Sequence, residues 1–199
     1  MRLESTQVIV AAERVRAAPA GRCAVAVILA LKDGGGRFIV RVGELMTRKV
    51  ATCGPDDTLD RAAQLMWDND CGCIPVCVLN DAVRPIGIIT DRDVCMSALF
   101  HGSRLSQLRV RDAMSRSVWS CGPGNSIMEA ERIMREAKIR RIPVVDANGA
   151  LVGLISLADL AREADREQTS PTQTLTGDEV GVTLARICAT RIDQPFDSS

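Results

Sequence analysis

Two pairs of polar residues share one spacing, a hydroxyl residue followed three positions later by an aspartate. The pairs are Thr90 with Asp93 and Ser156 with Asp159. Each pair follows an apolar run, so its hydroxyl can cap a helix that begins there while the aspartate bonds back to the cap. A carboxylate also has two oxygens that can accept hydrogen bonds from the hydroxyl groups of a ligand. The two roles are compatible, and both remain open for these pairs.

The two pairs belong to an internal duplication. Residues 42–66 align without a gap with residues 110–134, and the match continues to Pro75 against Pro143. After a loop that differs in length, it resumes with Gly87 to Asp93 against Gly153 to Asp159. A repeat of roughly seventy residues is too long for a solenoid unit and small for an independent domain. We therefore expect two related units that share one core, with a ligand cleft between them.

Each copy predicts the same order of elements: strand, helix, strand, strand, helix. In the first copy the strands are expected at 50–52, 74–79 and 85–90, with helices after Thr58 and at 91–98. In the second copy the strands are expected at 118–120, 142–145 and 151–156, with helices after Ser126 and at 157–164. The helices are predicted from apolar residues at helical spacing and the strands from short apolar runs that end at turns. The predicted fold class is α/β, built from α+β sandwich units with the sheet on one side.

This ordered series resembles the cystathionine β-synthase (CBS) domain, and the tandem copies resemble a CBS pair, or Bateman module. The shared pattern is Met-Thr/Ser-Arg, Gly-Pro, Ala-x-x-x-Met, Ile-Pro-Val, and Gly-hydrophobic-Ile-Thr/Ser-x-x-Asp, over about residues 42–165. The resemblance implies two domains in a pseudo-two-fold arrangement that bind an adenosine-containing ligand. It assigns contact with the ribose to Thr90, Asp93, Ser156 and Asp159.

Phosphate binding needs cations or free backbone donors, and the second copy offers Arg140 and Arg141 just before Ile142. The resemblance places basic residues that face phosphate at this position. Successive side chains of an extended chain point to opposite sides, so we expect one of the two arginines to enter the cleft. The first copy has Gly72 and Cys73 there instead, which predicts one strong and one weak or absent nucleotide site.

Adenine requires a flat apolar slot with backbone polar groups at its edge. Trp119 could stack on the base, although a tryptophan in a strand more often serves packing. The expected slot residues are the first strands of both copies and one position in each third strand: Val50, Ala51, Thr52, Val118, Trp119, Ser120, Ile88 and Leu154.

Composition argues against several classes of partner. Lys+Arg and Asp+Glu are balanced at 25 each, so no basic field would concentrate nucleic acid. Aromatic content is 3% with no Tyr, which removes a stacking platform for single strands. The longest apolar run, 23–31, is far below the ~20 residues of a membrane span. It also starts late for a secretory signal and lacks a cleavage site. We expect a cytoplasmic protein with no nucleic-acid or membrane partner.

The cysteines allow a structural and a chemical interpretation. Of the eight, only Cys71, Cys73 and Cys77 cluster, the sole histidine is distant, and no second Cys-x-x-Cys completes a zinc site. Cys53 and Cys121 occupy one position of the repeat beside Gly-Pro, which favours packing. We expect buried structural thiols, no metal site and no catalytic residue.

The chain divides into an N-terminal extension (1–41), the first CBS repeat (42–103), the second (104–165), and a linker with an amphipathic helix (166–199). The helix is predicted from the capping box at Thr176 and from apolar residues on one face, and it must cover its own core, a second subunit or a partner.

The expected function is a regulatory, non-catalytic module that senses AMP, ADP, ATP, NAD or S-adenosylmethionine and signals to a protein partner by changing shape. No cofactor is expected to be required, and the resemblance implies a homodimer. Two alternatives remain open: a scaffold whose nucleotide site has decayed, supported by Gly72 and Cys73, and a redox or metal sensor that uses the cysteine cluster.

Overall fold

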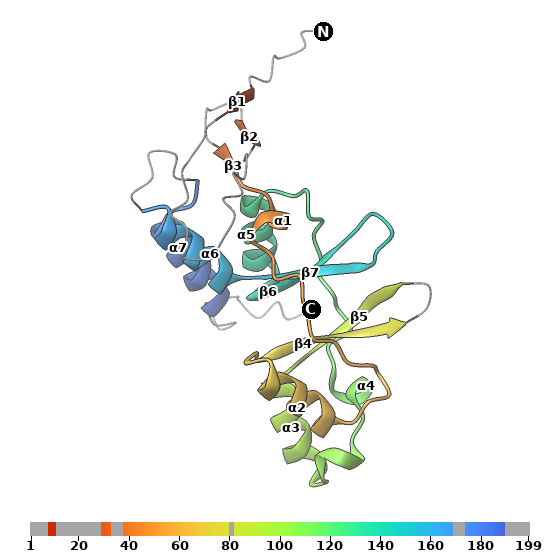
Figure 1. The fold of residues 1–199 in the computed structure, drawn as a ribbon. Coiled ribbons are helices and arrows are strands. Elements are labelled where there is room, and N and C mark those ends of the chain that lie inside the picture. Colours follow the sequence, from red (N-terminus) through yellow and green to blue (C-terminus); the bar gives the residue numbers. More distant parts are fainter. Residues whose placement is uncertain (1–7, 11–28, 33–37, 80–81, 169–173, 190–199) are drawn as a thin grey trace, which may run out of the picture.

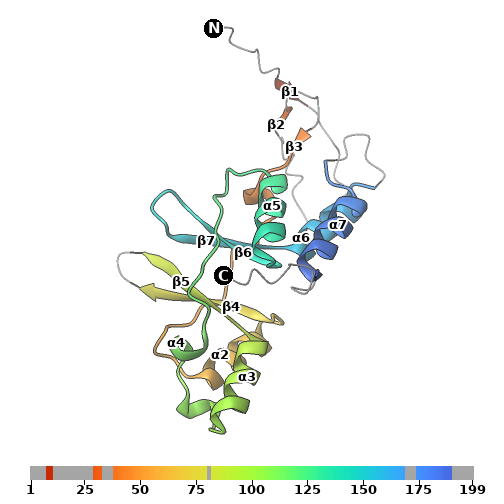
Figure 2. The same ribbon diagram turned by 180° about the vertical axis from the view of Figure 1, so that it is seen from behind.

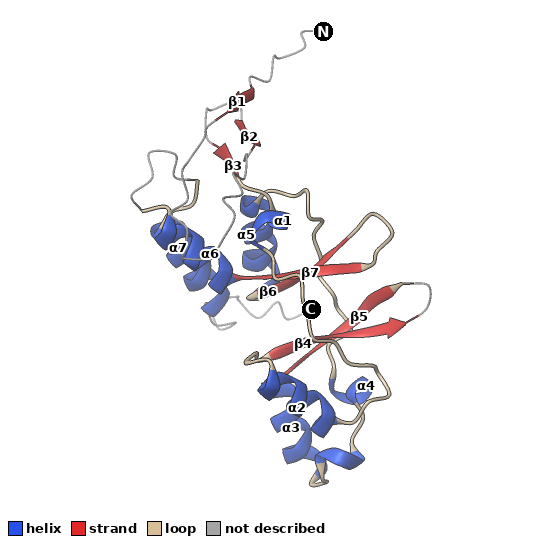
Figure 3. Ribbon diagram, in the orientation of Figure 1, coloured by secondary structure: helices blue, strands red, loops and turns tan. Residues whose placement is uncertain are grey.

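The computed structural model describes residues 8–10, 29–32, 38–79, 82–168 and 174–189. The two repeats form two α/β units whose strand pairs lie next to each other at the centre of the molecule (Figure 1). The helices lie on the outer sides of the two strand pairs, as the colouring by secondary structure shows (Figure 3). The α/β class with two small antiparallel sheets confirms the predicted fold.

The first repeat contains α2 (Leu59–Asp68), β4 (Cys73–Leu79), β5 (Val83–Thr90) and α3 (Asp91–His101), followed by the 3-10 turn η1 (Leu105–Gln107). Strands β4 and β5 pair antiparallel, and the register shifts after Val76. Leu59, Ala62 and Met66 of α2 recur at helical spacing and are buried, which follows from an amphipathic helix on a sheet. The largest buried side chains of this core are Leu59, Ile74, Val76, Ile89 and Val110.

The second repeat follows the same order with α5 (Ile127–Ala137), β6 (Arg141–Val145), β7 (Leu151–Ser156) and α6 (Leu157–Arg166). Its strands also pair antiparallel, with the same shift one residue before the end of the ladder. Ser126 caps α5 as expected by accepting a hydrogen bond from the backbone of Glu129. Thr58 precedes α2, but its side chain makes no capping hydrogen bond.

The strands expected at 50–52 and 118–120 are wrong. The chain next to these ranges pairs only at Cys53 with β4 and at Cys121 with β6, as isolated parallel bridges. The reason is proline, which has no N–H to donate. A parallel ladder that continued on either side of the Cys53 bridge would need backbone N–H donors at positions 55 and 75. Both positions are proline. The second repeat has proline at the corresponding positions 123 and 143.

The two repeats exchange the segments that precede them. The short helix α1 (Val42–Leu45) packs in the core of the second repeat, where Val42 contacts the cluster that contains Ile127 and Ile142. The short helix α4 (Val110–Ala113) packs in the core of the first repeat, with Val110 fully buried. The cores are therefore interlinked, which ties the orientation of one repeat to the other.

Two glycines permit the crossing of these segments. A Cβ on Gly87 would lie 2.7 Å from the sulfur of Met114 and 2.9 Å from the carbonyl oxygen of Ser115. A Cβ on Gly153 would lie 2.5 Å from the sulfur of Met46 and 3.0 Å from the carbonyl oxygen of Thr47. The repeated glycine therefore marks the point at which each exchanged segment crosses the neighbouring strand.

Helix α7 (Gly177–Cys188) packs on the core of its own chain. A core of its own, a second subunit and a partner were the three expected alternatives. It begins at the predicted capping box, in which Thr176 and Glu179 exchange hydrogen bonds. It packs beside α5 and α6 on the outer side of the second repeat, as the view from behind also shows (Figure 2). Leu175 and Val180 are buried in the second core.

The described part of the N-terminal extension forms a small antiparallel sheet. Its strands are β1 (Val8–Val10), β2 (Leu29–Lys32) and β3 (Phe38–Ile39), with β2 in the middle. No helix within the described ranges is long and apolar enough to cross a membrane.

Candidate functional site

The first hydroxyl–aspartate pair lies where β5 ends and α3 begins. The backbone N–H and the hydroxyl of Thr90 both donate to Oδ2 of Asp93, at 2.9 and 2.7 Å. The backbone N–H of Asp93 donates to the Thr90 hydroxyl oxygen at 3.2 Å. This is the predicted capping box. It uses one carboxylate oxygen and leaves Oδ1 of Asp93 without a partner among the described residues.

The second pair has the same geometry where β7 ends and α6 begins. Oδ2 of Asp159 accepts from the backbone and the hydroxyl of Ser156, at 2.8 and 2.7 Å. Its other oxygen differs from the first repeat, because Arg162 forms an ion pair with Oδ1 of Asp159. Sequence reasoning missed this contact. The signal was present, since residues three apart on a predicted helix are neighbours and their charges are opposite.

The exchanged segments cross the strands that end at the hydroxyl–aspartate pairs. Backbone groups of Thr47 and Leu154 exchange hydrogen bonds of 2.9 Å, which brings the chain leading to 50–52 beside β7. Ser115 and Ile88 do the same at 2.9 and 3.0 Å, which brings the chain leading to 118–120 beside β5. The segment before 118–120 therefore crosses β5, which ends at Thr90, and the segment before 50–52 crosses β7, which ends at Ser156.

The predicted slot residues differ in exposure. Val50, Ala51 and Thr52 are partly buried, as are Ile88 and Leu154. Trp119 is 51% exposed and Ser120 is exposed, so the tryptophan is not a core residue. An exposed indole keeps its face available to a ligand or to solvent.

The arginine pair lies at the start of β6, near the first repeat. Arg140 is exposed and Arg141 is partly buried. Both guanidinium groups act on the thiol of Cys73, which lies at the start of β4 opposite Thr90 in the ladder. Burial raises the pKa of Cys73, and the positive charge of Arg141 and then of Arg140 partly offsets this rise. The charges of both arginines therefore act on a residue that pairs with Thr90 across the first-repeat ladder.

Of the seven cysteines within the described ranges, four are buried, Cys71 is intermediate, and Cys95 and Cys188 are exposed, contrary to the expectation of buried thiols. Burial raises the pKa of Cys53 to about 12, and the pKa of Cys77 and of Cys121 to about 11. Such thiols are poor nucleophiles and poor metal ligands near neutral pH. Within the described ranges, no group of three His, Cys, Asp or Glu side chains could hold a metal ion.

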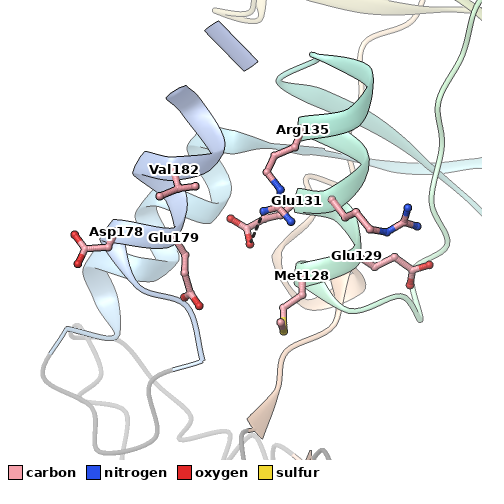
Figure 4. A pocket seen from close by; sticks show the side chains of 8 residues that line it. Met128, Glu129, Glu131, Arg135, Asp178, Glu179 and Val182 are labelled. Carbon is pink, nitrogen blue, oxygen red and sulfur yellow. Dashed lines mark ion pairs between the residues drawn. The ribbon is translucent and has the colours of Figure 1, made fainter. Parts of the chain in front are cut away.

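Two cavities lie on helical faces rather than at the predicted ligand residues. One of about 580 Å³ lies between α5 and α7, and Figure 4 shows Arg135 and Glu131 at its centre with Asp178 and Glu179 opposite. The other, of about 530 Å³, lies between α2 and α3. None of the predicted ligand residues lines either cavity.

Comparisons with known proteins agree with this architecture. Residues 42–98 and residues 110–166 each match the CBS domain family. The chain belongs to this family. The CBS domain-containing protein YhcV of Bacillus subtilis is 39% identical over 120 residues, which are 60% of this chain and 82% of that protein. A protein of Methanopyrus kandleri is 35% identical over 121 residues, and the match spans only 61% of its length.

Solved CBS structures share the fold. A crystal structure of Hypoxic Response Protein I with two coordinated zinc ions is 30% identical, with a TM-score of 0.55, and covers 62% of this chain and 98% of that one. A related sequence is Hypoxic response protein 1 of Mycobacterium tuberculosis, 32% identical over 119 residues, or 60% of this chain and 81% of that protein. A CBS domain protein of Pyrobaculum aerophilum complexed with AMP is 24% identical, with a TM-score of 0.55 over 61% of this chain and 90% of that one. At 24% identity this match shows a shared fold and no more.

Proposed function

We propose that this CBS pair is a regulatory module that binds an adenosine-containing ligand in the cytoplasm and passes the bound state to a partner protein. The observation that carries the proposal is the repeated capping box, which fixes Asp93 and Asp159 at strand ends beside a segment from the other repeat. A carboxylate held by its cap presents its second oxygen in a fixed direction, which reduces the ordering cost of binding a ribose.

The first ribose pair is the stronger candidate. Oδ1 of Asp93 has no partner in the described part of the chain, whereas Oδ1 of Asp159 already pairs with Arg162. Arg140 and Arg141 lie near Cys73, so a phosphate attached to a ribose at Asp93 would extend toward them. This arrangement supports one strong nucleotide site per chain, with the ribose held by the first repeat and the phosphate by the second.

A ligand held by both repeats can act as a signal. It stabilises the relative arrangement in which both sets of contacts form, by the difference between its affinities for the two arrangements. The exchanged segments carry such a change into both cores, because Val42 packs in the second core and Val110 in the first. No catalytic role and no required cofactor form part of the proposal.

Thermal shift with AMP, ADP, ATP, NAD and S-adenosylmethionine tests this function and selects the ligand. Saturable stabilisation that Asp93→Asn removes supports it. No stabilisation by any adenosine compound would favour the scaffold alternative, to which Gly72 and Cys73 at the arginine position point.

A metal sensor is the second candidate, because Hypoxic Response Protein I, which this chain resembles, coordinates two zinc ions. The same melting experiment with zinc, with a chelator and with reductant tests it. Stabilisation by zinc that is lost in a Cys71→Ser/Cys73→Ser variant would replace the nucleotide proposal.

The homodimer stays a prediction. A dimer that uses the helical faces of both repeats would need the outer face of α5 and α6, on which α7 packs in this structure. Light scattering at micromolar concentrations decides between 21.5 kDa and twice that mass.

A further inference from the structure

The first repeat has an open groove on its helical face, between α2 and α3. We call this cavity of about 530 Å³ the first-repeat groove, and its apolar lining includes Ala63, Met66, Trp67 and Val94. Trp67 is 85% exposed although it is the largest side chain of α2. Met66 and Val94 are themselves buried, so Trp67 is the strongly exposed part of this lining. An apolar groove with an exposed aromatic side chain and charged residues at its edge is typical of a surface that binds a partner.

The second repeat shows which kind of element covers the equivalent surface. In the sequence alignment Ala63 corresponds to Glu131 and Trp67 corresponds to Arg135. In the second repeat these two positions contact α7, since Glu131 and Arg135 both form hydrogen bonds with Thr183 (Figure 4 shows both side chains between α5 and α7). The surface that is open in the first repeat is therefore covered by a helix in the second.

The chemistry of the two grooves differs at these contacts. In the second repeat the two positions carry a carboxylate and a guanidinium, and both form hydrogen bonds with the hydroxyl of Thr183 on α7. The first repeat offers a methyl group and an indole, which would leave such a hydroxyl unpaired. A helix that fits the first-repeat groove must therefore be apolar where α7 is polar, which excludes α7 of another copy as its natural occupant.

At the end of the groove the first repeat carries a negative charge where the second repeat carries a positive one. Lys138 and Asp70 correspond in the alignment, and both have left-handed backbones, with φ of 53° and 47°. Lys138 donates a 3.2 Å hydrogen bond to the carbonyl oxygen of Ala189, at the C-terminal end of α7, where the helix dipole is negative. Asp70 places a negative charge at the same position, and Asp91 adds a second on the groove lining. Both carboxylates favour a positive group of the bound helix.

We propose that the first-repeat groove binds an amphipathic helix of a partner protein. The helix presents an apolar face to Ala63, Met66 and Trp67, and its positive end, the N-terminal turn or a lysine or arginine, lies against Asp70 and Asp91. The groove and the ribose pairs share no residue, so this proposal does not depend on the identity of the nucleotide.

Tryptophan fluorescence of the full chain provides the test. The chain has two tryptophans, so a Trp119→Phe background leaves Trp67 as the sole reporter. The probes are two stapled helical peptides with the same leucine face, one with lysines and one with glutamates at its N-terminal turn. The basic peptide should shift Trp67 emission to the blue, protect it from acrylamide, and bind roughly three- to tenfold more tightly than the acidic one at low salt.

Charge reversal at one position makes the test specific. Asp70→Lys should abolish the preference for the basic peptide, because the new lysine offsets the charge of Asp91, and Lys138 shows that lysine adopts this backbone conformation. Ala63→Glu should abolish binding of both. The matched controls are Asp165→Lys, which changes an exposed acid of α6, and Leu79→Ser, which removes a 79% exposed leucine outside the groove. Both controls should bind like the parent, and Asp93→Asn should bind the peptides normally whether or not it binds nucleotide.

Three results would overturn the proposal. The first is the absence of saturable binding of either peptide. The second is binding that Asp70→Lys and Ala63→Glu leave unchanged. The third is a dimeric full chain that Trp67→Ala converts to a monomer, because a second copy would then occupy the groove.

Discussion

The hydroxyl of Thr183 on α7 lies between Glu131 and Arg135 of α5. It donates to the Glu131 carboxylate at 3.1 Å and accepts from the Arg135 guanidinium at 3.0 Å. The Thr183 side chain is fully buried and Glu131 is 4% exposed. The contact between α5 and α7 is therefore polar at its centre, and its stability depends on every group there keeping its partner.

Thr183→Val keeps the shape of the side chain and removes this hydroxyl. Glu131 then loses its donor in a buried position, and the free energy of unfolding should fall by about 1–3 kcal/mol. Urea denaturation measures the loss. Val182→Ala on the same helix is the control, because Val182 is 55% exposed and should change stability by less than about 0.5 kcal/mol. Equal effects of the two variants would show that the hydrogen bond adds nothing.

The stability of the second repeat should depend on the protonation of Glu131. Burial raises the pKa of this carboxyl above its usual 4.5; the hydrogen bond from Thr183 and the charge of Arg135 oppose the rise, and the charge of Glu179 adds to it. The folded state therefore holds the proton more tightly than the unfolded state. This contribution to stability is full below pH 4.5 and is lost as the pH rises through the folded pKa.

Glu131→Gln removes that titration and keeps an oxygen that can accept from Thr183. Relative to the parent, the variant should gain stability as the pH rises above 4.5. Urea denaturation of both proteins at a series of pH values between about 4 and 8 checks this sign. Parallel curves over that range would mean that Glu131 does not titrate differently in the two states.

The sequence predicted the units of this fold better than their connection. Val42 and Val110 align in the duplication, and the structure buries both completely. The alignment cannot say which core buries each valine, because both cores offer equivalent surfaces. The exchange depends on the path of the chain after each short helix, which brings Thr47 to Leu154 and Ser115 to Ile88. For the same reason the sequence predicted the two capping boxes but not which segment crosses the strand that ends at each box.

Alanine at the two crossing glycines should lower stability, whereas alanine at a glycine inside α7 should raise it. Gly87→Ala and Gly153→Ala place a methyl group within 3.0 Å of backbone oxygen and methionine sulfur, and each should cost about 1–3 kcal/mol. Gly181→Ala is the matched control, because this glycine lies inside α7 with nothing within 4 Å of the added carbon. It should raise stability by about 0.5–1 kcal/mol through helix propensity. Melting temperatures of Gly87→Ala and Gly153→Ala that equal or exceed that of the parent would contradict the crossing geometry.

Thiol reactivity separates structural from sensing cysteines. In a Cys23→Ser background, the exposed Cys95 and Cys188 should react quickly with a chromogenic disulfide at pH 8. Cys53, Cys77 and Cys121 have pKa values raised by burial to about 12, 11 and 11, and should react at least about a hundredfold more slowly until the chain unfolds. Fast reaction of Cys73 and Cys77 in the folded protein would instead support the redox alternative. Mass spectrometry after timed quenching assigns the rates.

Ribose and phosphate contacts should be separable by mutation. A hydrogen bond to a charged group contributes about 1.5–3 kcal/mol, so alanine at the cleft-facing member of Arg140 and Arg141 should weaken AMP or ATP about ten- to a hundredfold. Adenosine, which has no phosphate, should bind that variant as it binds the parent. Asp93→Asn should weaken nucleotide and nucleoside alike, and should penalise the 2′-deoxy form least because that form already lacks one contact.

The second ribose pair provides the internal control. Arg162 occupies Oδ1 of Asp159, so Asp159→Asn should change nucleotide affinity less than Asp93→Asn does. Arg162→Ala frees that oxygen and should strengthen the weak site by only a few-fold, because Arg162 is largely exposed and its ion pair is screened by solvent. Titration calorimetry of AMP against the parent and the three variants counts the sites and measures each affinity. Two equal sites in the parent, or arginine variants that bind ATP and adenosine with unchanged affinity, would mean that the phosphate does not lie at Arg140 and Arg141.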